Sequence, residues 1–172
     1  MLLGQFTIDV RMLEVIVLAA GRGTRMKSEL PKVLHPIGGK PMVACVLDTA
    51  RQLGAERIHV VVGHGASQVS DAVAAPDVEI YLQSEQLGTG HAALQAAPSC
   101  HDDNTVLVLF GDVPLLSAGV LADVVSAAET QPTLLAATLE DPSGYGRVIR
   151  GTDGSFTRVV EQKDGLPHEL EV

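Results

Sequence analysis

Residues 15–20 read VIVLAA and are followed at once by Gly21-Arg22-Gly23. An apolar run this short, closed by a glycine, predicts a buried parallel strand rather than a helix. Further apolar runs occur at residues 58–62, 78–82 and 106–110, and helical patterns occur at 40–53, 66–75, 88–97 and from Ser117 to about 129. This alternation predicts an α/β fold in which helices cover both faces of a doubly wound, mostly parallel, Rossmann-like sheet.

The chain beyond Pro132 has a different pattern. Residues 133–139, 146–150 and 155–161 are predicted strands, and Asp153-Gly154 is a strong signal for a hairpin between the last two. No Pro/Ser-rich linker or internal repeat divides the sequence. We therefore expect one domain over residues 12–172, preceded by an N-terminal arm of residues 1–11.

Charge and hydropathy argue against several classes of protein. The 172 residues carry 12 Lys and Arg against 21 Asp and Glu, a net charge of −9, which is the wrong sign for neutralising the phosphates of a nucleic acid polymer. No apolar run approaches the roughly 20 residues of a membrane span, and the N-terminus does not read as an export signal. Two cysteines, Cys45 and Cys100, cannot form a disulfide framework, so we expect a reduced, cytoplasmic compartment.

The loop after the first predicted strand concentrates positive charge in an acidic protein. Gly21 and Gly23 let backbone amides approach a ligand, and Met26 stands where the dinucleotide-binding fingerprint needs a third glycine. A Walker A motif is also absent. The basic residues near these glycines suit a triphosphate: Arg22, Arg25, Lys27 and Lys32. Without further information, these residues are equally compatible with an ordinary turn whose basic side chains are exposed to solvent.

The motif at residues 18–26, LAAGRGTRM, with Pro31-Lys32 after it, resembles the signature of the sugar-nucleotide pyrophosphorylases. Within that family the chain most closely resembles the bacterial N-acetylglucosamine-1-phosphate uridylyltransferases, which are N-terminal halves of bifunctional enzymes. The resemblance implies a fold of the nucleotide-diphospho-sugar transferase type, with a loop that wraps the nucleotide phosphates. Its implied substrate contacts here are Leu18, Ala19, Ala20, Gly21 and Lys32. It also implies that Arg25 and Lys32 stabilise the charge on the transferred phosphoryl group.

Residues 83–91, QSEQLGTGH, form the most specific segment of the sequence. A buried glutamine both donates and accepts hydrogen bonds, which matches the imide edge of uracil, and glycines at a helix start expose backbone amides. The alternative is a polar loop in which Thr89 caps a helix and His91 lies in its first turn. The run resembles the base-binding segment of the uridylyltransferases, which implies that Gln83 and Gly88 contact uracil and that Thr89 lies near the sugar phosphate.

A single acid, Asp112, follows the apolar strand predicted at residues 106–110. A carboxylate there destabilises the fold unless it is paired or holds a cation, and Mg²⁺ bridging nucleotide phosphates is a common use. The alternative is a turn or cap residue before Pro114. The resemblance implies that Asp112 holds Mg²⁺ and that Phe110 and Gly111 contact substrate. The family often has a tyrosine where Phe110 stands, so the hydrogen bond of that hydroxyl is missing here.

The resemblance places two sugar contacts near the end of the chain. It implies a backbone contact from Gly146 and hydrogen bonds from sugar hydroxyls to Glu161, where the residues alone indicate a Gly-rich loop and a solvated strand residue. It covers residues 12 to about 164. The family's Asn-Thr-Gly segment, a second asparagine ligand to Mg²⁺ and the hexapeptide repeats of an acetyltransferase half would all lie beyond Val172. We therefore expect residues 1–172 to be weakly active or inactive alone. For the full-length members of the family, the resemblance implies a homotrimer.

The resemblance, added to these residues, predicts an Mg²⁺-dependent enzyme that transfers uridylyl from UTP to N-acetylglucosamine 1-phosphate and releases pyrophosphate. The sugar phosphate would attack the α-phosphorus in line, and Arg25, Lys32 and Asp112 with its Mg²⁺ would neutralise charge without a general base. The resemblance implies that the product, UDP-N-acetylglucosamine, serves peptidoglycan and lipopolysaccharide synthesis. The alternatives are a related nucleotidyltransferase with another sugar or base, and a non-catalytic nucleotide-binding fragment.

Overall fold

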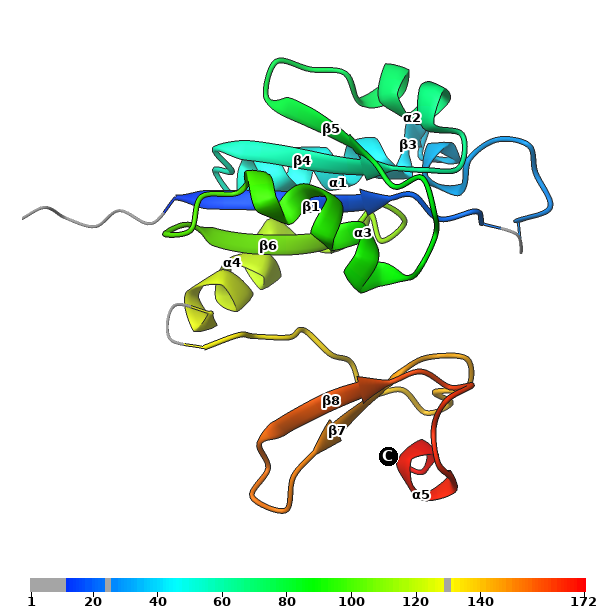
Figure 1. Ribbon diagram of the computed structural model, residues 1–172, viewed down its shortest axis with the longest axis vertical. Helices are drawn as coiled ribbons and strands as arrows, with labels where there is room; N and C mark the ends of the chain where they lie inside the picture. The colour runs from blue at the N-terminus through cyan, green and yellow to red at the C-terminus, as the bar shows by residue number, and fades with distance from the viewer. Residues whose placement is uncertain (1–11, 24–25, 129–130) are drawn as a thin grey trace, which may run out of the picture. The chain divides into compact units, whose positions relative to one another are not determined.

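The computed structural model of the protein describes residues 12–23, 26–128 and 131–172 (Figure 1). The chain divides into two compact units, an N-terminal unit (Met1–Thr133) and a C-terminal unit (Leu134–Val172). We describe each unit by itself. The organisation of residues 12–172 as one domain stays a prediction, and the arm at residues 1–11 lies outside the described residues.

The N-terminal unit is built on a parallel sheet of the order β5-β4-β1-β6. Its strands are β1 (Leu13–Ala19), β4 (Arg57–Val62), β5 (Val78–Leu82) and β6 (Thr105–Phe110). All four coincide with apolar runs in the sequence, which confirms those predicted strands. β1 lies in the middle, with Val17 beside Val60 of β4 on one side and beside Leu109 of β6 on the other.

Helices cover both faces of this sheet, which confirms the doubly wound architecture. The helices are α1 (Met42–Gln52), α2 (Ala66–Val73), α3 (Thr89–Ala96) and α4 (Ala118–Ala127). Val15 and Val17 of β1 pack in one core cluster with buried residues of α1, α2 and α4, whereas Ile16 and Leu18 pack with Ala92 and Ala96 of α3. Figure 1 shows α3 in front of the sheet and α1 behind it. None of the helices described is long and apolar enough to cross a bilayer.

The prediction of a strand at residues 133–139 is wrong, because this segment forms neither a helix nor a strand. Its apolar side chains are exposed, with Leu134 at 53% and Leu135 at 45%. The prediction rested on apolar composition, but a strand also needs a neighbour that accepts and donates its backbone hydrogen bonds. Among the described residues of the C-terminal unit, β7 (Arg147–Arg150) and β8 (Phe156–Val160) pair only with each other.

The β7–β8 pair is the antiparallel hairpin predicted from Asp153-Gly154. Gly154 has a φ of +82°, and the Asp153 carboxylate accepts a hydrogen bond from the Ser155 amide at 3.0 Å. Sequence periodicity did not predict the shortest elements. These are the helical turns η2 (Lys32–Leu34) and η3 (Ala97–Ser99), the ribbon strands β2 (Pro36–Ile37) and β3 (Lys40–Pro41), and α5 (Pro167–Leu170).

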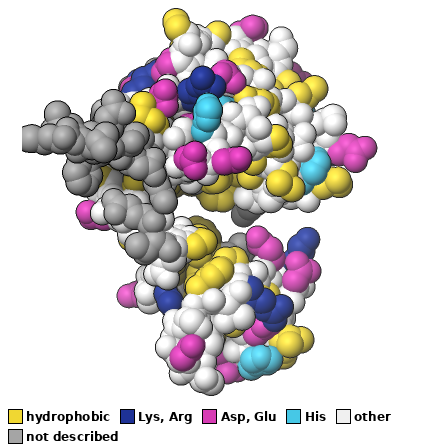
Figure 2. All heavy atoms as spheres, turned by 60° about the vertical axis from the view of Figure 1, so that its left-hand side comes forward, with side chains coloured by type: hydrophobic (Ala, Val, Ile, Leu, Met, Phe, Trp, Pro, Cys, Tyr) yellow, Lys and Arg dark blue, Asp and Glu magenta, His cyan; other side chains and the backbone are white. Residues whose placement is uncertain are grey.

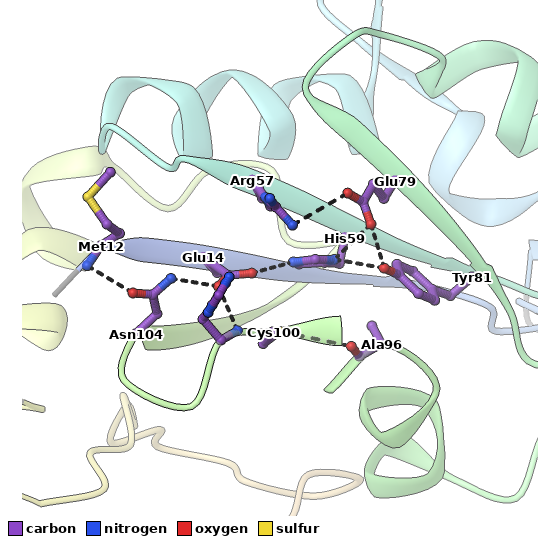
Figure 3. Close-up of polar contacts among 10 residues, drawn as sticks. Met12, Glu14, Arg57, His59, Glu79, Tyr81, Ala96, Cys100 and Asn104 are labelled. Carbon is purple, nitrogen blue, oxygen red and sulfur yellow. Dashed lines mark hydrogen bonds and ion pairs between the residues drawn. The ribbon is translucent and has the colours of Figure 1, made fainter. Parts of the chain in front are cut away.

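A buried polar network joins the strands near their amino ends (Figure 3). Glu14 of β1 and His59 of β4 are both 0% exposed, and Glu14 Oε2 lies 2.7 Å from His59 Nε2. The other Glu14 oxygen accepts hydrogen bonds from the His101 amide at 2.9 Å and from Asn104 Nδ2 at 2.7 Å. His59 Nδ1 lies 3.2 Å from the hydroxyl of Tyr81 on β5. The network therefore ties three strands to the connection that leads into β6.

The Glu14 carboxyl group has a strongly lowered pKa. Burial by itself would raise this pKa, but the His101 amide, Asn104 and His59 together lower it from the usual 4.5 to about 2. The charged form is therefore the form that the fold stabilises. Its contribution to stability is present above pH 4.5 and is lost as the pH falls through about 2.

We expect the substitution Glu14→Gln to lower stability near neutral pH and to reduce its dependence on acid. The shift of the Glu14 pKa corresponds to a contribution on the order of 3 kcal/mol, which the neutral amide cannot supply. Urea denaturation at about pH 7 and about pH 3 measures this dependence. Glu56→Gln, just before β4, where the side chain is exposed, is the control and should keep the wild-type dependence. An equal pH dependence in wild type and Glu14→Gln would contradict the assignment.

Candidate active site

A cavity of about 540 Å³ opens at the carboxyl ends of the parallel strands in the N-terminal unit. Ligands of open α/β sheets bind at this edge of the sheet. The walls come mainly from the segments that follow β1, β5 and β6. The lining residues are Leu18, Ala20, Gly21, Gly23, Met26, Lys32, Val33, Gln83, Gln86, Gly88, Thr89, Ala92, Phe110 and Asp112.

The structure brings most of the predicted nucleotide contacts to this cavity. Those that line it are Leu18, Ala20, Gly21, Lys32, Gln83, Gly88, Thr89, Phe110 and Asp112. Ala19 does not, because its side chain is buried in the core on the α1 face of the sheet. Gly111 is also buried behind the cavity, and its amide donates a hydrogen bond to the Leu18 carbonyl at 2.9 Å.

Three predicted residues lie outside the part of the N-terminal unit that the structure describes. Gly146 and Glu161 belong to the C-terminal unit, where Gly146 precedes β7 and the exposed Glu161 follows β8. Arg25 lies outside the described residues. The roles of these three residues stay predictions.

Lys32 and Asp112 form an ion pair at the cavity wall. Lys32 Nζ donates to Asp112 Oδ2 at 2.6 Å, and the two side chains are 37% and 31% exposed. The sequence predicts that an acid in this position must be paired or hold a cation, and the structure shows the pairing. Both groups remain accessible from the cavity, so a phosphate and a cation could each exchange for the present partner.

Two glycines allow the walls to approach closely. Gly23 has a φ of +58°, and a β-carbon added there would lie only 2.7 Å from the β-carbon of Lys32. A β-carbon on Gly63, directly after β4, would lie 2.8 Å from the Ala20 carbonyl oxygen and 3.1 Å from Gln86 Nε2. The loops after β1 and β4 can therefore pack this tightly only with glycine at both positions.

Gln83 and Gln86 organise the segment after β5. Gln83 is only 3% exposed, and its backbone amide donates to the Val62 carbonyl at 2.8 Å. Gln86 Nε2 donates to the Gln83 carbonyl at 3.2 Å, while Gln86 Oε1 accepts from Arg22 Nε at 3.2 Å. Gln86 therefore connects the segment after β5 to the loop after β1. Gly88, not Thr89, is the N-cap residue of α3.

Several lining residues were missed by the sequence analysis. Gln86 lies inside the glutamine-rich segment at residues 83–91, so its position was a usable signal. Met26 and Val33 are nonpolar and carry no chemical signature, although each lies beside a predicted phosphate contact. Their place in the cavity depends on how the loop after β1 folds back toward η2.

A second group of polar side chains lies at the amino end of the sheet. Ligand atoms of Glu14, His59 and Cys100 lie within 4.8 Å of one another. Spacing in the sequence could not reveal this group, because its members lie on β1, on β4 and after η3. Both oxygens of Glu14 and both ring nitrogens of His59 already have protein partners (Figure 3). We therefore assign this group a structural role.

Comparisons with known proteins agree with this site. Residues 15–151 match the MobA-like NTP transferase domain. The chain is 55% identical over 154 residues to the bifunctional protein GlmU of Cellvibrio japonicus, and the match covers 89% of this chain and 34% of that protein. The resemblance to part of a bifunctional enzyme is thereby confirmed. The chain spans only about a third of the length of such relatives, 34% and 36% for two of them.

Solved structures show the same fold. A nucleotidyl transferase from Methanothermobacter has a TM-score of 0.61 and 25% sequence identity, with 67% of this chain and 57% of that chain covered. Rv0371c of Mycobacterium tuberculosis in complex with manganese has a TM-score of 0.58 and 22% identity, with 89% and 72% covered. The parallel sheet, the cavity at its carboxyl edge and the match over residues 15–151 lead to one conclusion: the chain belongs to the MobA-like NTP transferase domain family.

Proposed function

We propose that the chain carries the site for Mg²⁺-dependent transfer of uridylyl from UTP to N-acetylglucosamine 1-phosphate, giving UDP-N-acetylglucosamine and pyrophosphate. The observation that carries this proposal is that a single cavity is lined both by the buried amide of Gln83 and by the Lys32–Asp112 ion pair. The first suits a nucleobase, and the second suits phosphates with a cation. The 55% identity to a protein named GlmU supports the choice of substrates.

The phosphates would be held by local features of an acidic protein. The net charge is −9, and Figure 2 shows acidic side chains spread over the visible face. Positive potential for a triphosphate must therefore come from the site itself. Lys32 and the backbone of Gly21 and Gly23 line the cavity and would supply it, and Arg25 would add a second positive side chain.

The residues present fit a magnesium ion. Asp112 offers a hard carboxylate oxygen at the cavity wall, and Mg²⁺ in nucleotide sites is commonly held by one or two carboxylates together with the substrate phosphates. The manganese complex of a protein with this fold supports a divalent cation in general. When bound, the ion would neutralise charge on the phosphate oxygens.

The proposed chemistry needs positioning and charge neutralisation rather than a protein nucleophile. A sugar phosphate already carries the attacking oxygen, so the side chains hold the reactants in line. Lys32 would leave Asp112 and donate to a phosphate oxygen, and Gly146 and Glu161 would contact the sugar. Cys45 and Cys100 are both free in the structure, which supports the proposal of a cytoplasmic enzyme.

Titration calorimetry with nucleotides tests this proposal. The chain should bind UTP in the presence of Mg²⁺ more tightly than it binds ATP or GTP, because a site shaped by Gln83 and Gly88 suits a pyrimidine. Formation of UDP-N-acetylglucosamine from both substrates is the accompanying activity assay, and dTTP or CTP in place of UTP exposes a related transferase. Binding of ATP as tight as that of UTP would overturn the proposal.

We expect Asp112→Asn to remove the effect of Mg²⁺ on UTP binding, because the amide lacks the charge that holds the cation. The dissociation constant of wild type for UTP should fall at least about tenfold on adding Mg²⁺, whereas that of the variant should stay nearly constant. Asp123→Asn on α4, where the side chain is exposed, is the matched control and should behave as wild type. Retention of the full magnesium effect by Asp112→Asn would refute the metal assignment.

The close approach of Gly23 to Lys32 generates a separate prediction. In Gly23→Ala the added methyl group meets the Lys32 side chain, and the positive φ is strained for alanine, so we expect UTP affinity to fall about tenfold. Gly119→Ala in α4 is the control, since open space surrounds its added β-carbon. Equal UTP affinities of the two variants would show that Gly23 does not set the position of Lys32.

A further inference from the structure

We propose that His91 is a positioning residue that sets the preference of the site for uracil over cytosine, by fixing the side-chain amide of Gln83. This inference rests on the proposed function, because it concerns the base of the nucleotide bound there. It adds a residue that does not line the cavity and makes its contact from within α3.

The orientation of the Gln83 amide follows from its neighbour Gly88. One end of this amide lies 3.2 Å from the Gly88 carbonyl oxygen. A carbonyl oxygen accepts hydrogen bonds and never donates, so the atom facing it must be the Nε2 donor. The carbonyl oxygen of the side chain, Oε1, therefore points away from Gly88.

His91 holds the same amide from a second direction. Gln83 Nε2 lies 3.0 Å from His91 Nδ1. Because Nε2 carries only hydrogens, Nδ1 must be the acceptor, and the proton of the neutral ring then lies on the Nε2 of His91. Gln83 thus uses both hydrogens of its amide on fixed acceptors, one from the backbone and one from His91.

Gln95 is the rival partner for the ring of His91. Its Nε2 lies 3.3 Å from His91 Nε2 and also donates to the His91 carbonyl at 2.9 Å. A neutral imidazole accepts a hydrogen bond at only one nitrogen, so the two glutamines cannot both donate to it. The contact of Gln83 is shorter, and its orientation is already set by Gly88. Gln95 is partly exposed and can keep its hydrogen bond to the His91 carbonyl while its longer contact to the ring is given up.

The side-chain oxygen of Gln83 is left available to a ligand in the cavity that this residue lines. No donor from the described residues lies within hydrogen-bond distance of Oε1, so a bound ligand can supply one. Gln83 lines the cavity and is otherwise buried. The oxygen thus presents an acceptor to whatever base enters.

An acceptor at this position distinguishes uracil from cytosine. Uracil carries a hydrogen on N3 and can donate it to Oε1, whereas N3 of cytosine is an acceptor and would face another acceptor. Cytosine in the same position could be accommodated only if Gln83 turned its amide, which would set Oε1 against both the Gly88 oxygen and His91 Nδ1. Sites built to hydrogen-bond a substrate N–H reject analogues that lack it, and His91 supplies part of that rejection here.

The test compares the affinities of the 172-residue chain for UTP and CTP by calorimetry in His91→Leu and His91→Asn. Leucine places a carbon where Nδ1 stands, whereas asparagine can place its Oδ1 acceptor at the same distance along the side chain. We expect the preference for UTP over CTP to fall about fivefold in His91→Leu, through gain of CTP binding as well as loss of UTP binding. His91→Asn should keep most of the wild-type ratio. A merely structural defect would weaken both nucleotides and leave the ratio unchanged.

Gln95→Ala is the control, because it removes the other contact to the ring without removing the Nδ1 acceptor; its UTP to CTP ratio should match wild type. If His91→Leu does not fold, the nitrogen-15 shifts of the His91 ring in the wild-type chain with UTP give the same answer. They should show Nδ1 without a proton. A proton on Nδ1, or a ratio unchanged in His91→Leu while wild type prefers UTP, overturns the role of His91. Lack of any UTP preference in wild type instead overturns the proposed function.

Discussion

The hydrogen bonds of β1 to a parallel strand on each side are the constraint on which the site depends. Ala19 of β1 pairs with Val62 of β4, and Leu18 pairs with Phe110 of β6, so these strands end at one edge of the sheet. The amide of Gly111 donates to Leu18, and that of His64 donates to Ala20. Backbone contacts thus continue past the strand ends. Backbone contacts alone therefore bring together segments that are distant in sequence.

The two edges of the sheet carry polar groups of opposite character. At the amino edge Glu14 and His59 are fully buried and every hydrogen-bonding atom of the two side chains has a protein partner. At the carboxyl edge Lys32 and Asp112 are about one-third exposed and pair mainly with each other. Breaking the first pair leaves an uncompensated buried charge, whereas the second pair can exchange partners with a ligand. Stability and ligand binding are therefore assigned to different ends of the same strands.

The sequence predicted the sheet well because four apolar runs have strand length and end at glycine or polar residues. It also singled out Gln83 and Asp112, both of which line the cavity. It failed at residues 133–139, where apolar composition could not reveal the lack of a neighbouring strand. The hydrogen bonds of Gln83 to Gly88 and His91 depend on how α3 begins, and that of Gln86 to Arg22 on the loop after β1. Spacing along the chain contains no information about such contacts.

The Lys32–Asp112 ion pair has a consequence for the order and strength of ligand binding. A nucleotide phosphate would compete with Asp112 for Lys32, and a cation would compete with Lys32 for Asp112. Whichever ligand arrives first bears the cost of opening the pair, and the second finds its own partner already released. For the proposed ligands the two binding equilibria are therefore thermodynamically coupled, each raising the affinity for the other by the same factor. The empty protein, with its two charges mutually neutralised, resists occupation by either ligand alone.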